Sequence, residues 1–309
     1  MNSFEKLFQS NNPFFILPEL KKVSYKKFYK KSKIFAGQYQ KYLINKKNKI
    51  VFLKMERSLD FYVAFIGLSL LETTIVPISK KMSSKEILYL KKIYKPILEI
   101  NSLSVNLNKV ENESFEVKNN FLKNAKVIFF SSGTTGKPKG IRHNIFKLLE
   151  SAKSFSKLAS YKKKDIILHN WPHYYMAGFF NMFLCPLVSK ACIYFDDEIG
   201  INSYLKYWQE LKKNKITIAY LSPTMAKALI NYSKYNILKS KNKNIRIIST
   251  GSFLYPNILK EFYKIFKIKL INCYGVTEIG ASIGLAHKNI HNLVGKISNG
   301  VSIKLSNKN

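Results

Sequence analysis

Apolar residues recur along the chain with two periods, which predicts helices and strands in alternation. In residues 23–44 they stand at helical spacing, as Phe28, Ile34, Phe35 and Tyr39 show, whereas residues 50–53 form the short apolar run typical of a buried strand. Further helices are expected over 58–71, from 83 or 84 to about 94, over 145–159 and 201–213, from 222 onward and over 256–266. Further strands are expected at 73–77, 96–100, 127–130, 165–169, 190–195, 216–221, 245–249 and 269–272.

Because strands alternate with helices, we expect an α/β fold with mostly parallel sheets flanked by helices. The chain has 309 residues, which exceeds the length at which a single hydrophobic core commonly splits, so two packed subdomains are expected. The polar stretch 101–120 is expected to be a loop with weak strand character.

The composition is strongly basic. The 52 Lys and Arg against 18 Asp and Glu give a formal net charge of +34, which would ordinarily indicate nucleic acid or an anionic membrane as partner. Only Arg57, Arg142 and Arg246 are arginines, whereas recognition of bases and phosphates favours the forked guanidinium. The lysines are spread along the whole chain, so a solvated lysine surface is favoured over a specific nucleic-acid footprint.

Cysteine use and the apolar runs bear on the compartment. Cys185, Cys192 and Cys273 lie amid apolar residues without Cys-x-x-Cys spacing, which indicates buried thiols in a reducing compartment. The N-terminus lacks the apolar segment of a signal peptide. The longest apolar run, 174–188, is interrupted and shorter than a membrane span requires. We therefore expect a cytoplasmic location and no membrane span.

One stretch, residues 127–140, changes abruptly from an apolar strand to glycines, hydroxyls and lysines. Glycines permit close backbone approach to a ligand, hydroxyls donate hydrogen bonds and lysines supply charge, so the stretch suits a polyphosphate. The residues concerned are Ser131, Ser132, Gly133, Thr134, Thr135, Gly136, Lys137, Lys139 and Gly140. Their spacing is not that of the common phosphate loop, which disfavours a Walker-type nucleotidase.

A second motif follows the strand at 269–272 and reads Asn272-Cys-Tyr-Gly-Val-Thr-Glu278. Tyr274 offers a flat face to a base, Gly275 permits close approach, Thr277 can donate to a phosphate and Glu278 supplies a hard carboxylate for Mg²⁺. The pair His287 and His291 has the i, i+4 spacing of metal ligands but no third ligand, so a solvated loop is favoured there.

Both motifs resemble signatures of the adenylate-forming superfamily, which includes acyl-CoA synthetases, adenylation domains of peptide synthetases and firefly luciferase. In the first signature Ser131 stands where the family has threonine, and the second signature matches without substitution. The family's Pro-x-x-His-x-x-Gly motif is kept at Pro172 and Gly178, but Tyr175 replaces its histidine and His173 is the nearest imidazole.

The resemblance implies the N-terminal core of this superfamily over residues 21–309, after an extension over residues 1–20. The core would divide near residue 120 into a first part and a second part, 121–309, that carries both motifs. The C-terminal domain of complete members, with its lysine, has no counterpart in the sequence. We expect it to be absent from this polypeptide or supplied by another.

The resemblance also assigns roles to residues. Thr277, Glu278 and Lys139 would act on the reacting phosphate, with Glu278 holding Mg²⁺. His173, Tyr175 and Gly178 would line the acid pocket, although plain core packing remains the alternative for the two rings. The ATP contacts would come from Ser131, Ser132, Gly133, Thr134, Thr135, Gly136, Lys137, Gly251, Ser252, Phe253, Asn272, Cys273, Tyr274, Gly275 and Thr277.

The implied reaction joins a small carboxylic acid to the α-phosphate of ATP and releases pyrophosphate. The acyl group would then pass to CoA or to the phosphopantetheine of a carrier protein. Two alternatives stay open: a nucleotide-binding module without turnover, and the remnant of a truncated synthetase.

Overall fold

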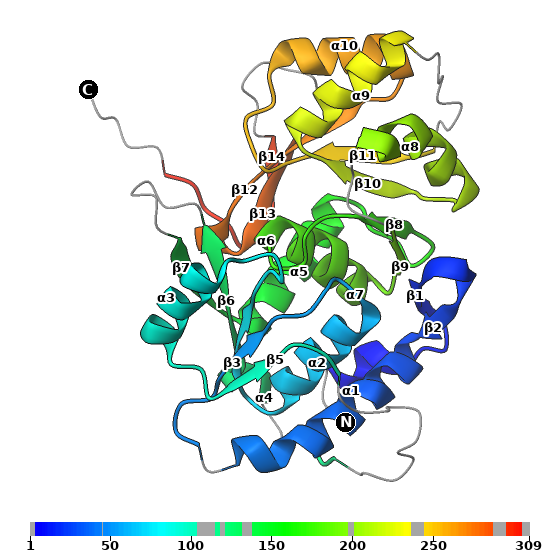
Figure 1. Cartoon of the computed structure of the whole chain (residues 1–309). Helices are drawn as coiled ribbons and strands as arrows, with labels where there is room; N and C mark the ends of the chain where they lie inside the picture. The colour runs from blue at the N-terminus through cyan, green and yellow to red at the C-terminus, as the bar shows by residue number, and fades with distance from the viewer. Residues whose placement is uncertain are drawn as a thin grey trace.

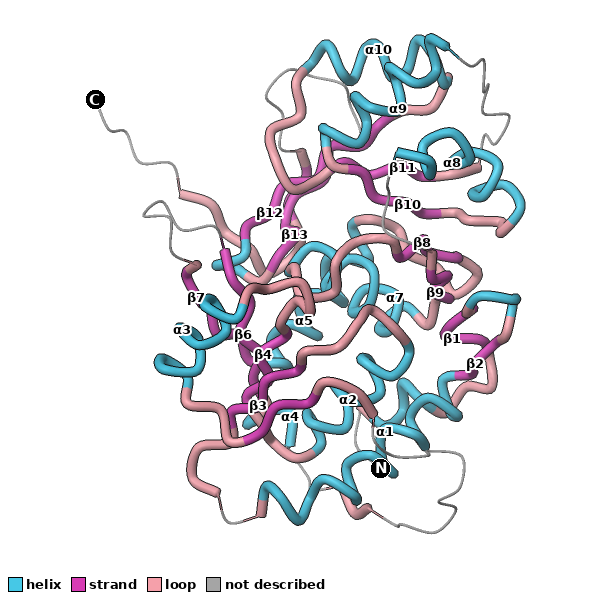
Figure 2. Tube along the Cα trace, viewed as in Figure 1, coloured by secondary structure: helices cyan, strands magenta, loops and turns pink. Residues whose placement is uncertain are grey.

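Two sheets and the helices around them build the molecule (Figure 1). The computed structural model describes residues 4–44, 46–103, 115–117, 121–131, 138–196, 201–235, 244–286 and 295–304. Figure 2 shows the larger sheet, with strands β8 to β13, above the smaller one, with strands β3 to β7. The α/β fold with mostly parallel sheets flanked by helices is therefore confirmed.

The smaller sheet is parallel except at one edge, where the last strand runs antiparallel to its neighbour. Helices α1 and α2 lie on one of its faces and α3 on the other. In spatial order the strands are β5 (Leu98–Ile100), β3 (Ile50–Leu53), β4 (Thr74–Pro77), β6 (Lys126–Ser131) and β7 (Lys139–Asn144). The helices are α1 (Tyr25–Leu43), α2 (Leu59–Leu70), α3 (Ser84–Tyr94) and the short α4 (Phe121–Asn124).

The larger sheet is parallel from β12 to β1 and antiparallel at both edges. In spatial order its described strands are β14 (Lys296–Ile297), β13 (Ala281–Ala286), β12 (Leu270–Val276), β11 (Arg246–Ser249), β10 (Ile218–Leu221), β8 (Ile166–His169), β9 (Cys192–Phe195), β1 (Pro13–Ile16) and β2 (Lys22–Ser24). The 3₁₀ segments η1 (Glu5–Phe8) and η2 (Pro18–Leu20) flank β1.

Two helical layers cover the larger sheet, and each encloses its own hydrophobic cluster. One face packs against α5 (Ile145–Leu158), α6 (Met176–Phe179), the π-helix η3 (Phe180–Leu184) and α7 (Cys185–Ser189). The other face packs against α8 (Ile201–Lys213), α9 (Pro223–Tyr235) and α10 (Pro256–Phe266). The first cluster continues into the smaller sheet, so the two sheets share one core.

Local capping explains where several helices begin. Ser58, Ser83 and Asn144 each accept a hydrogen bond from a main-chain amide in the first turn of α2, α3 and α5, which satisfies a donor that the helix leaves unpaired. Glu86 completes a capping box with Ser83. Helix α2 is apolar on all sides and buried along nearly its whole length, as its position between α1 and β4 requires.

The predicted elements are confirmed, and the structure adds elements that the sequence pattern did not predict. Residues 1–20, expected to be an extension, contribute β1, which pairs with β9 inside the larger sheet. Residues 139–144 form β7 instead of leading straight into a helix. The run 174–188 becomes α6, η3 and α7, and across the described residues no helix has the length and apolar character needed to cross a membrane.

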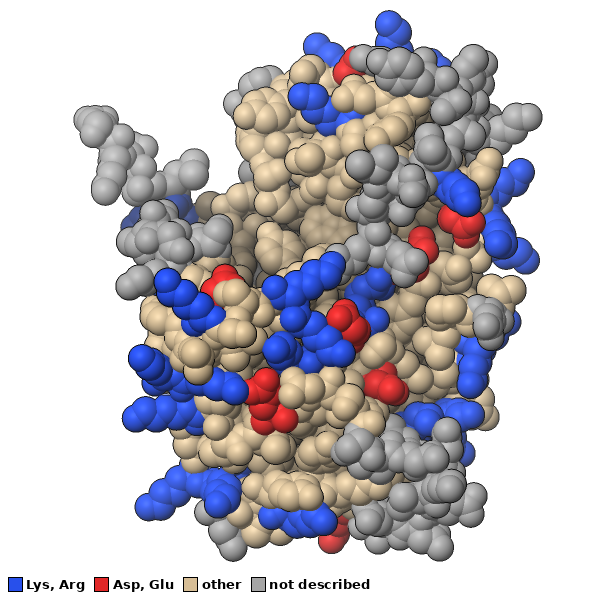
Figure 3. Space-filling view, viewed as in Figure 1, with Lys and Arg blue, Asp and Glu red and all other residues tan. Residues whose placement is uncertain are grey.

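Lysine and arginine side chains are distributed over the face shown in Figure 3, with acidic side chains between them. This distribution agrees with a solvated basic surface. The same view shows a hollow between the upper and lower parts of the molecule, at the level where the two sheets meet.

Candidate functional site

A cleft of about 290 Å³ lies where three strands end. Because the neighbouring parallel strands β11 and β12 end at the same edge of the larger sheet, residues that follow them meet there, as ligand sites of α/β sheets do. Strand β6 of the smaller sheet ends at the same place. The described lining residues are Ser131, Tyr175, Met176, Ala177, Thr250, Gly251, Gly275, Val276, Thr277, Glu278 and Ser282.

The stretch predicted to bind phosphate reaches the cleft at one end. Ser131, the last residue of β6, lines the cleft and pairs directly with Lys139 of β7. The exposed Lys139 is not among the described lining residues. Residues Ser132 to Lys137 lie outside the described part of the chain. The antiparallel pairing of β6 with β7 therefore holds the two ends of the predicted loop side by side, with Ser131 at the cleft.

Gly140 lies where the paired strands β6 and β7 pack closely against Tyr94 of α3. A Cβ atom built on Gly140 would lie 1.9 Å from Tyr94 Oη and 3.1 Å from Ile128 Cγ2. The Tyr94 side chain at the end of α3 therefore packs against β6 and β7, and it would have to shift to accommodate a side chain at position 140.

Thr277 and Glu278 open the short 3₁₀ segment η4 (Thr277–Ile279) and face the cleft. Gly280 ends this turn with φ of +83° and donates its amide to the Thr277 carbonyl at 3.2 Å. A Cβ on Gly280 would lie 2.9 Å from Leu148 Cδ2 of α5. Both the left-handed backbone and the close helix favour glycine there, and together they fix the position of Glu278, which is exposed.

His143 of β7 was not identified from the sequence, although it contacts this turn. Its ring is hydrogen-bonded to the Thr277 main chain, and its Nδ1 lies 3.8 Å from the Cβ position of Gly280. Its Nε2 is buried and has no partner in the part of the chain that the structure describes. Burial lowers the pKa of His143, and the Thr277 hydrogen bond and the Glu278 carboxylate oppose that shift. No local signal marked His143, because its role depends on a strand that the pattern did not predict.

The segment after β11 contributes Gly251, whose φ of +97° is in the left-handed region. A Cβ there would lie 3.6 Å from the Trp171 ring, so the indole packs against the main chain at this turn. Ser252 is exposed. Phe253 is 56% exposed, packs edge-on against Tyr255 and does not line the cleft.

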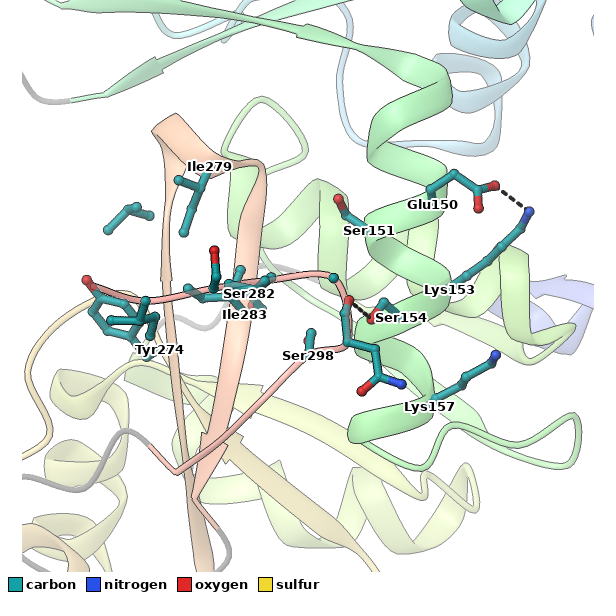
Figure 4. A pocket seen from close by; sticks show the side chains of 16 residues that line it. Glu150, Ser151, Lys153, Ser154, Lys157, Tyr274, Ile279, Ser282, Ile283 and Ser298 are labelled. Atoms are coloured by element: carbon teal, nitrogen blue, oxygen red, sulfur yellow. Dashed lines mark hydrogen bonds and ion pairs between the residues drawn. The ribbon is translucent and has the colours of Figure 1, made fainter. Parts of the chain in front are cut away.

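Tyr274 lies on the other side of β12 from Thr277. It is 43% exposed and lines a second cleft, of about 810 Å³. That cleft lies between the β12–β13 hairpin, helix α5 and residues 298–303 (Figure 4). The two clefts adjoin, because Val276 and Ser282 line both of them. Asn272 is half-buried, and Cys273 is buried beneath the first cleft.

The three residues predicted for the acid pocket have different positions. Tyr175 is 38% exposed and lines the cleft, with its ring 6.4 Å from that of Trp171. His173 is 3% exposed and packs edge-on against Phe61 at 4.2 Å, outside the described lining. A Cβ on Gly178 would lie 2.4 Å from the Pro172 carbonyl oxygen, so Gly178 allows the close packing of this turn.

Other polar features lie apart from the cleft. The three cysteines are free and buried, as predicted. Among the described residues, no cluster of three or more His, Cys, Asp or Glu could hold a metal ion. His287 and His291 lie outside the described residues.

Comparisons with known proteins identify the family of the chain. A family model for "AMP-binding enzyme" matches residues 8–309. A malonate–CoA ligase of Arabidopsis thaliana is 25% identical over 228 residues, which cover 68% of this chain and 37% of that protein. A 2-succinylbenzoate–CoA ligase of the same plant is 29% identical over 161 residues, covering 52% and 28%. The chain spans about a third of the length of these curated relatives.

Solved structures show the same fold. ATP-bound MatB from Rhodopseudomonas palustris has a TM-score of 0.81 at 16% identity, covering 97% of this chain and 65% of that one. The N-terminal subdomain of Klebsiella oxytoca NpsA, in complex with 3-hydroxyanthranilyl-AMSN, has a TM-score of 0.77 at 18% identity, covering 93% and 74%. With the match of the family model to nearly the whole sequence, the chain belongs to the family of AMP-binding enzymes.

Proposed function

We propose that the chain is the nucleotide-binding core of an ATP-dependent ligase that activates a carboxylic acid as acyl-AMP and releases pyrophosphate. One observation carries the proposal. The cleft brings Ser131, at the edge of the phosphate-binding stretch, together with Gly251 and with Thr277 and Glu278 of the second motif. These residues come from different sheets and from distant parts of the chain, and they meet at the carboxyl ends of strands, where α/β sheets bind ligands.

Each part of the cleft has a chemical task in this reaction. The stretch from Ser131 to Lys139 would hold the β- and γ-phosphates, and Thr277 would donate to the α-phosphate. Glu278 would hold Mg²⁺, which neutralises charge on the phosphate oxygens when bound. The main chain at Gly251 and Ser252 would lie against the base. Such catalysis is largely positioning and charge stabilisation at phosphorus.

The acid would enter beside Tyr175, with its carboxylate directed toward Thr277. Transfer of the acyl group to CoA or to a phosphopantetheine thiol is the second proposed step, and the curated CoA ligases support it. The chain spans only about a third of their length. We therefore propose that thioester formation needs a further domain, which another segment or polypeptide supplies.

The test is carboxylate-dependent exchange of labelled pyrophosphate into ATP by the purified chain. Pools of fatty, aromatic, hydroxy and amino acids are supplied in turn, and Mg-ATP binding is measured by calorimetry on the same preparation. We expect exchange with at least one pool. Binding of Mg-ATP without exchange would support a nucleotide-binding module instead, and the absence of both would contradict the proposal.

Glu278→Ala sharpens this test. The variant should weaken Mg²⁺-dependent ATP binding and lower exchange by about 10²-fold, on the scale of one lost transition-state contact. Glu56→Ala, which removes the same charge from an exposed position outside the cleft, is the matched control. Unchanged Mg-ATP affinity in Glu278→Ala would refute the metal assignment.

A further inference from the structure

The inner wall of the cleft consists of small polar side chains that are themselves buried. Thr250 and Ser282 line the cleft and are each 4% exposed. The thiol of Cys273 is hydrogen-bonded to both of these side chains. Ser282 Oγ in turn donates to Asn181 Oδ1 at 2.9 Å. The wall that faces an incoming acid is therefore a chain of hydrogen-bonding groups.

Aromatic side chains fill the space behind this wall. Tyr161 Oη donates to the Asn181 carbonyl at 2.9 Å and lies 2.7 Å from Tyr220 Oη. The Trp171 indole N–H donates to the Tyr220 carbonyl at 3.1 Å, and its ring lies under Gly251. All four side chains are buried. A long acyl chain would have to break these hydrogen bonds inside the core, where each unsatisfied group is costly.

The wall also has an unused donor. Asn181 is fully buried, and its Nδ2 has no hydrogen-bond partner among the described residues. Burial raises the pKa of the Cys273 thiol to about 11, so this group stays protonated and neutral. Asn181 does not itself line the cleft, so it acts on a ligand through Ser282, whose hydroxyl group it orients.

The charged residues among the described lining of the cleft bear on whether the acid carries a neutral or an anionic substituent. Among its described lining residues Glu278 is acidic, and none is lysine or arginine. A second carboxylate placed against Thr250 and Ser282 would be desolvated without a described cation beside it, which is unfavourable. A hydroxyl group in the same place could both donate and accept.

We infer that the acid is a short-chain carboxylic acid with a neutral hydrogen-bonding substituent, held against Thr250 and Ser282. The inference rests on the proposed function, since it names the substrate class of that site. The hydroxyls of the wall recognise the substituent, and the Trp171, Tyr161 and Tyr220 side chains limit the length of the acyl chain.

The test uses calorimetric binding of acyl-sulfamoyl adenosines, which imitate acyl-AMP and require no turnover. The acyl groups are 3-hydroxybutyryl, butyryl, succinyl and decanoyl, with AMP as a further ligand. We expect 3-hydroxybutyryl to bind about fivefold more tightly than butyryl, the effect of one neutral hydrogen bond. Succinyl and decanoyl should bind more weakly than butyryl.

The outcomes separate this inference from the proposed function. Decanoyl or succinyl binding as tightly as 3-hydroxybutyryl would overturn the inference and leave the function standing. Equal binding of 3-hydroxybutyryl and butyryl would do the same. If neither AMP nor any analogue binds, the proposed function fails, and the inference fails with it.

Variants of Thr250 and Ser282 test whether the wall causes this preference. Thr250→Val keeps the shape of the side chain and removes its hydroxyl, and Ser282→Ala removes the other hydroxyl. Each should abolish the preference for 3-hydroxybutyryl over butyryl, measured as the ratio of the two affinities in the same variant. Ser151→Ala on α5, which lines the second cleft, should keep the preference. A preference that survives in both wall variants would overturn the assignment.

Discussion

His143 and Thr277 join the two sheets at the rim of the cleft. His143 belongs to β7 of the smaller sheet, and Thr277 follows β12 of the larger one. The imidazole is hydrogen-bonded to the Thr277 main chain, in the turn that the Gly280 amide closes. The position of Glu278 relative to the phosphate-binding stretch therefore depends in part on one side chain of β7.

Replacing His143 should loosen this turn. His143→Leu removes the hydrogen bond and should weaken protection of the Gly280 amide against hydrogen exchange about fivefold, the effect of one hydrogen bond. His143→Gln, which keeps a donor, should retain most of the protection. Exchange measured by NMR at Gly280, with Gly251 as a reference amide, checks this. Equal protection in both variants would show that the imidazole does not hold the turn.

A second link, between Arg246 and Asp165, stabilises the opposite end of the larger sheet. Arg246 Nη2 lies 2.6 Å from Asp165 Oδ2, and Arg246 Nη1 donates to the carbonyls of Ala159 and Ser160. Asp165 is 4% exposed and also accepts from Thr217 Oγ1 at 2.8 Å. Breaking such a pair leaves a buried charge without its partner.

Arg246→Met should therefore lower the free energy of unfolding by about 3 kcal/mol, measured by urea denaturation. Asp165→Leu should have an effect of similar size. In the double variant neither charge remains. The decrease in its free energy of unfolding should therefore be clearly smaller than the sum of the decreases in the two single variants. Strictly additive losses would show that the two side chains do not stabilise each other.

The fold and both motifs could be predicted because their signals are local. Apolar periodicity identified nearly every helix and most strands, and the helices expected from residues 58, 83 or 84 and 145 begin there, each after a capping side chain. Strand β7 could not be predicted in this way. As an edge strand with polar or partly exposed residues on both faces, it has no period-two pattern.

The candidate site was less predictable because it depends on which side chains share a face. Thr277 of the second motif lines the first cleft and Tyr274 lines the second, and the two clefts share Val276 and Ser282. The division of the motif between two adjoining clefts cannot be predicted from the order of its residues. The places of His143 and Asn181 follow from contacts between distant segments, and no pattern along the chain encodes such contacts.

Replacing Gly178 by a larger residue should destabilise the protein for steric reasons. A Cβ there would lie 2.4 Å from the Pro172 carbonyl oxygen and 3.1 Å from Trp171 Cβ, so Gly178→Ala must displace the turn that precedes Tyr175. We expect the free energy of unfolding, measured by urea denaturation, to fall by about 2 kcal/mol, which is typical of overpacking. Gly300→Ala is the control, since no atom of the described residues lies within 4 Å of its Cβ position and its φ of +84° is what opposes alanine. A smaller loss for Gly178→Ala than for Gly300→Ala would contradict the steric argument.

The neighbouring rings of His169 and His173 should make the protein sensitive to mild acid. Tyr62 Oη contacts His169 Nε2. Burial, reinforced by the charge of Arg57, lowers the pKa of His169 well below its usual range and that of His173 to about 3. Both rings are therefore neutral in the folded state at neutral pH, whereas in the unfolded chain each takes up a proton below a pH of about 6.5.

A folded pKa below the unfolded one gives stability that is complete above a pH of about 6.5 and lost as the pH falls toward 3. At pH 5 each ring should lower the free energy of unfolding by about 2 kcal/mol relative to pH 7.5. Urea denaturation at both pH values measures this difference. His173→Phe keeps an aromatic ring against Phe61 and removes one titrating group. The pH-dependent loss should then fall by about half, because only His169 still distinguishes the two states. A loss of unchanged size in His173→Phe would show that this ring is already protonated in the folded protein at pH 5.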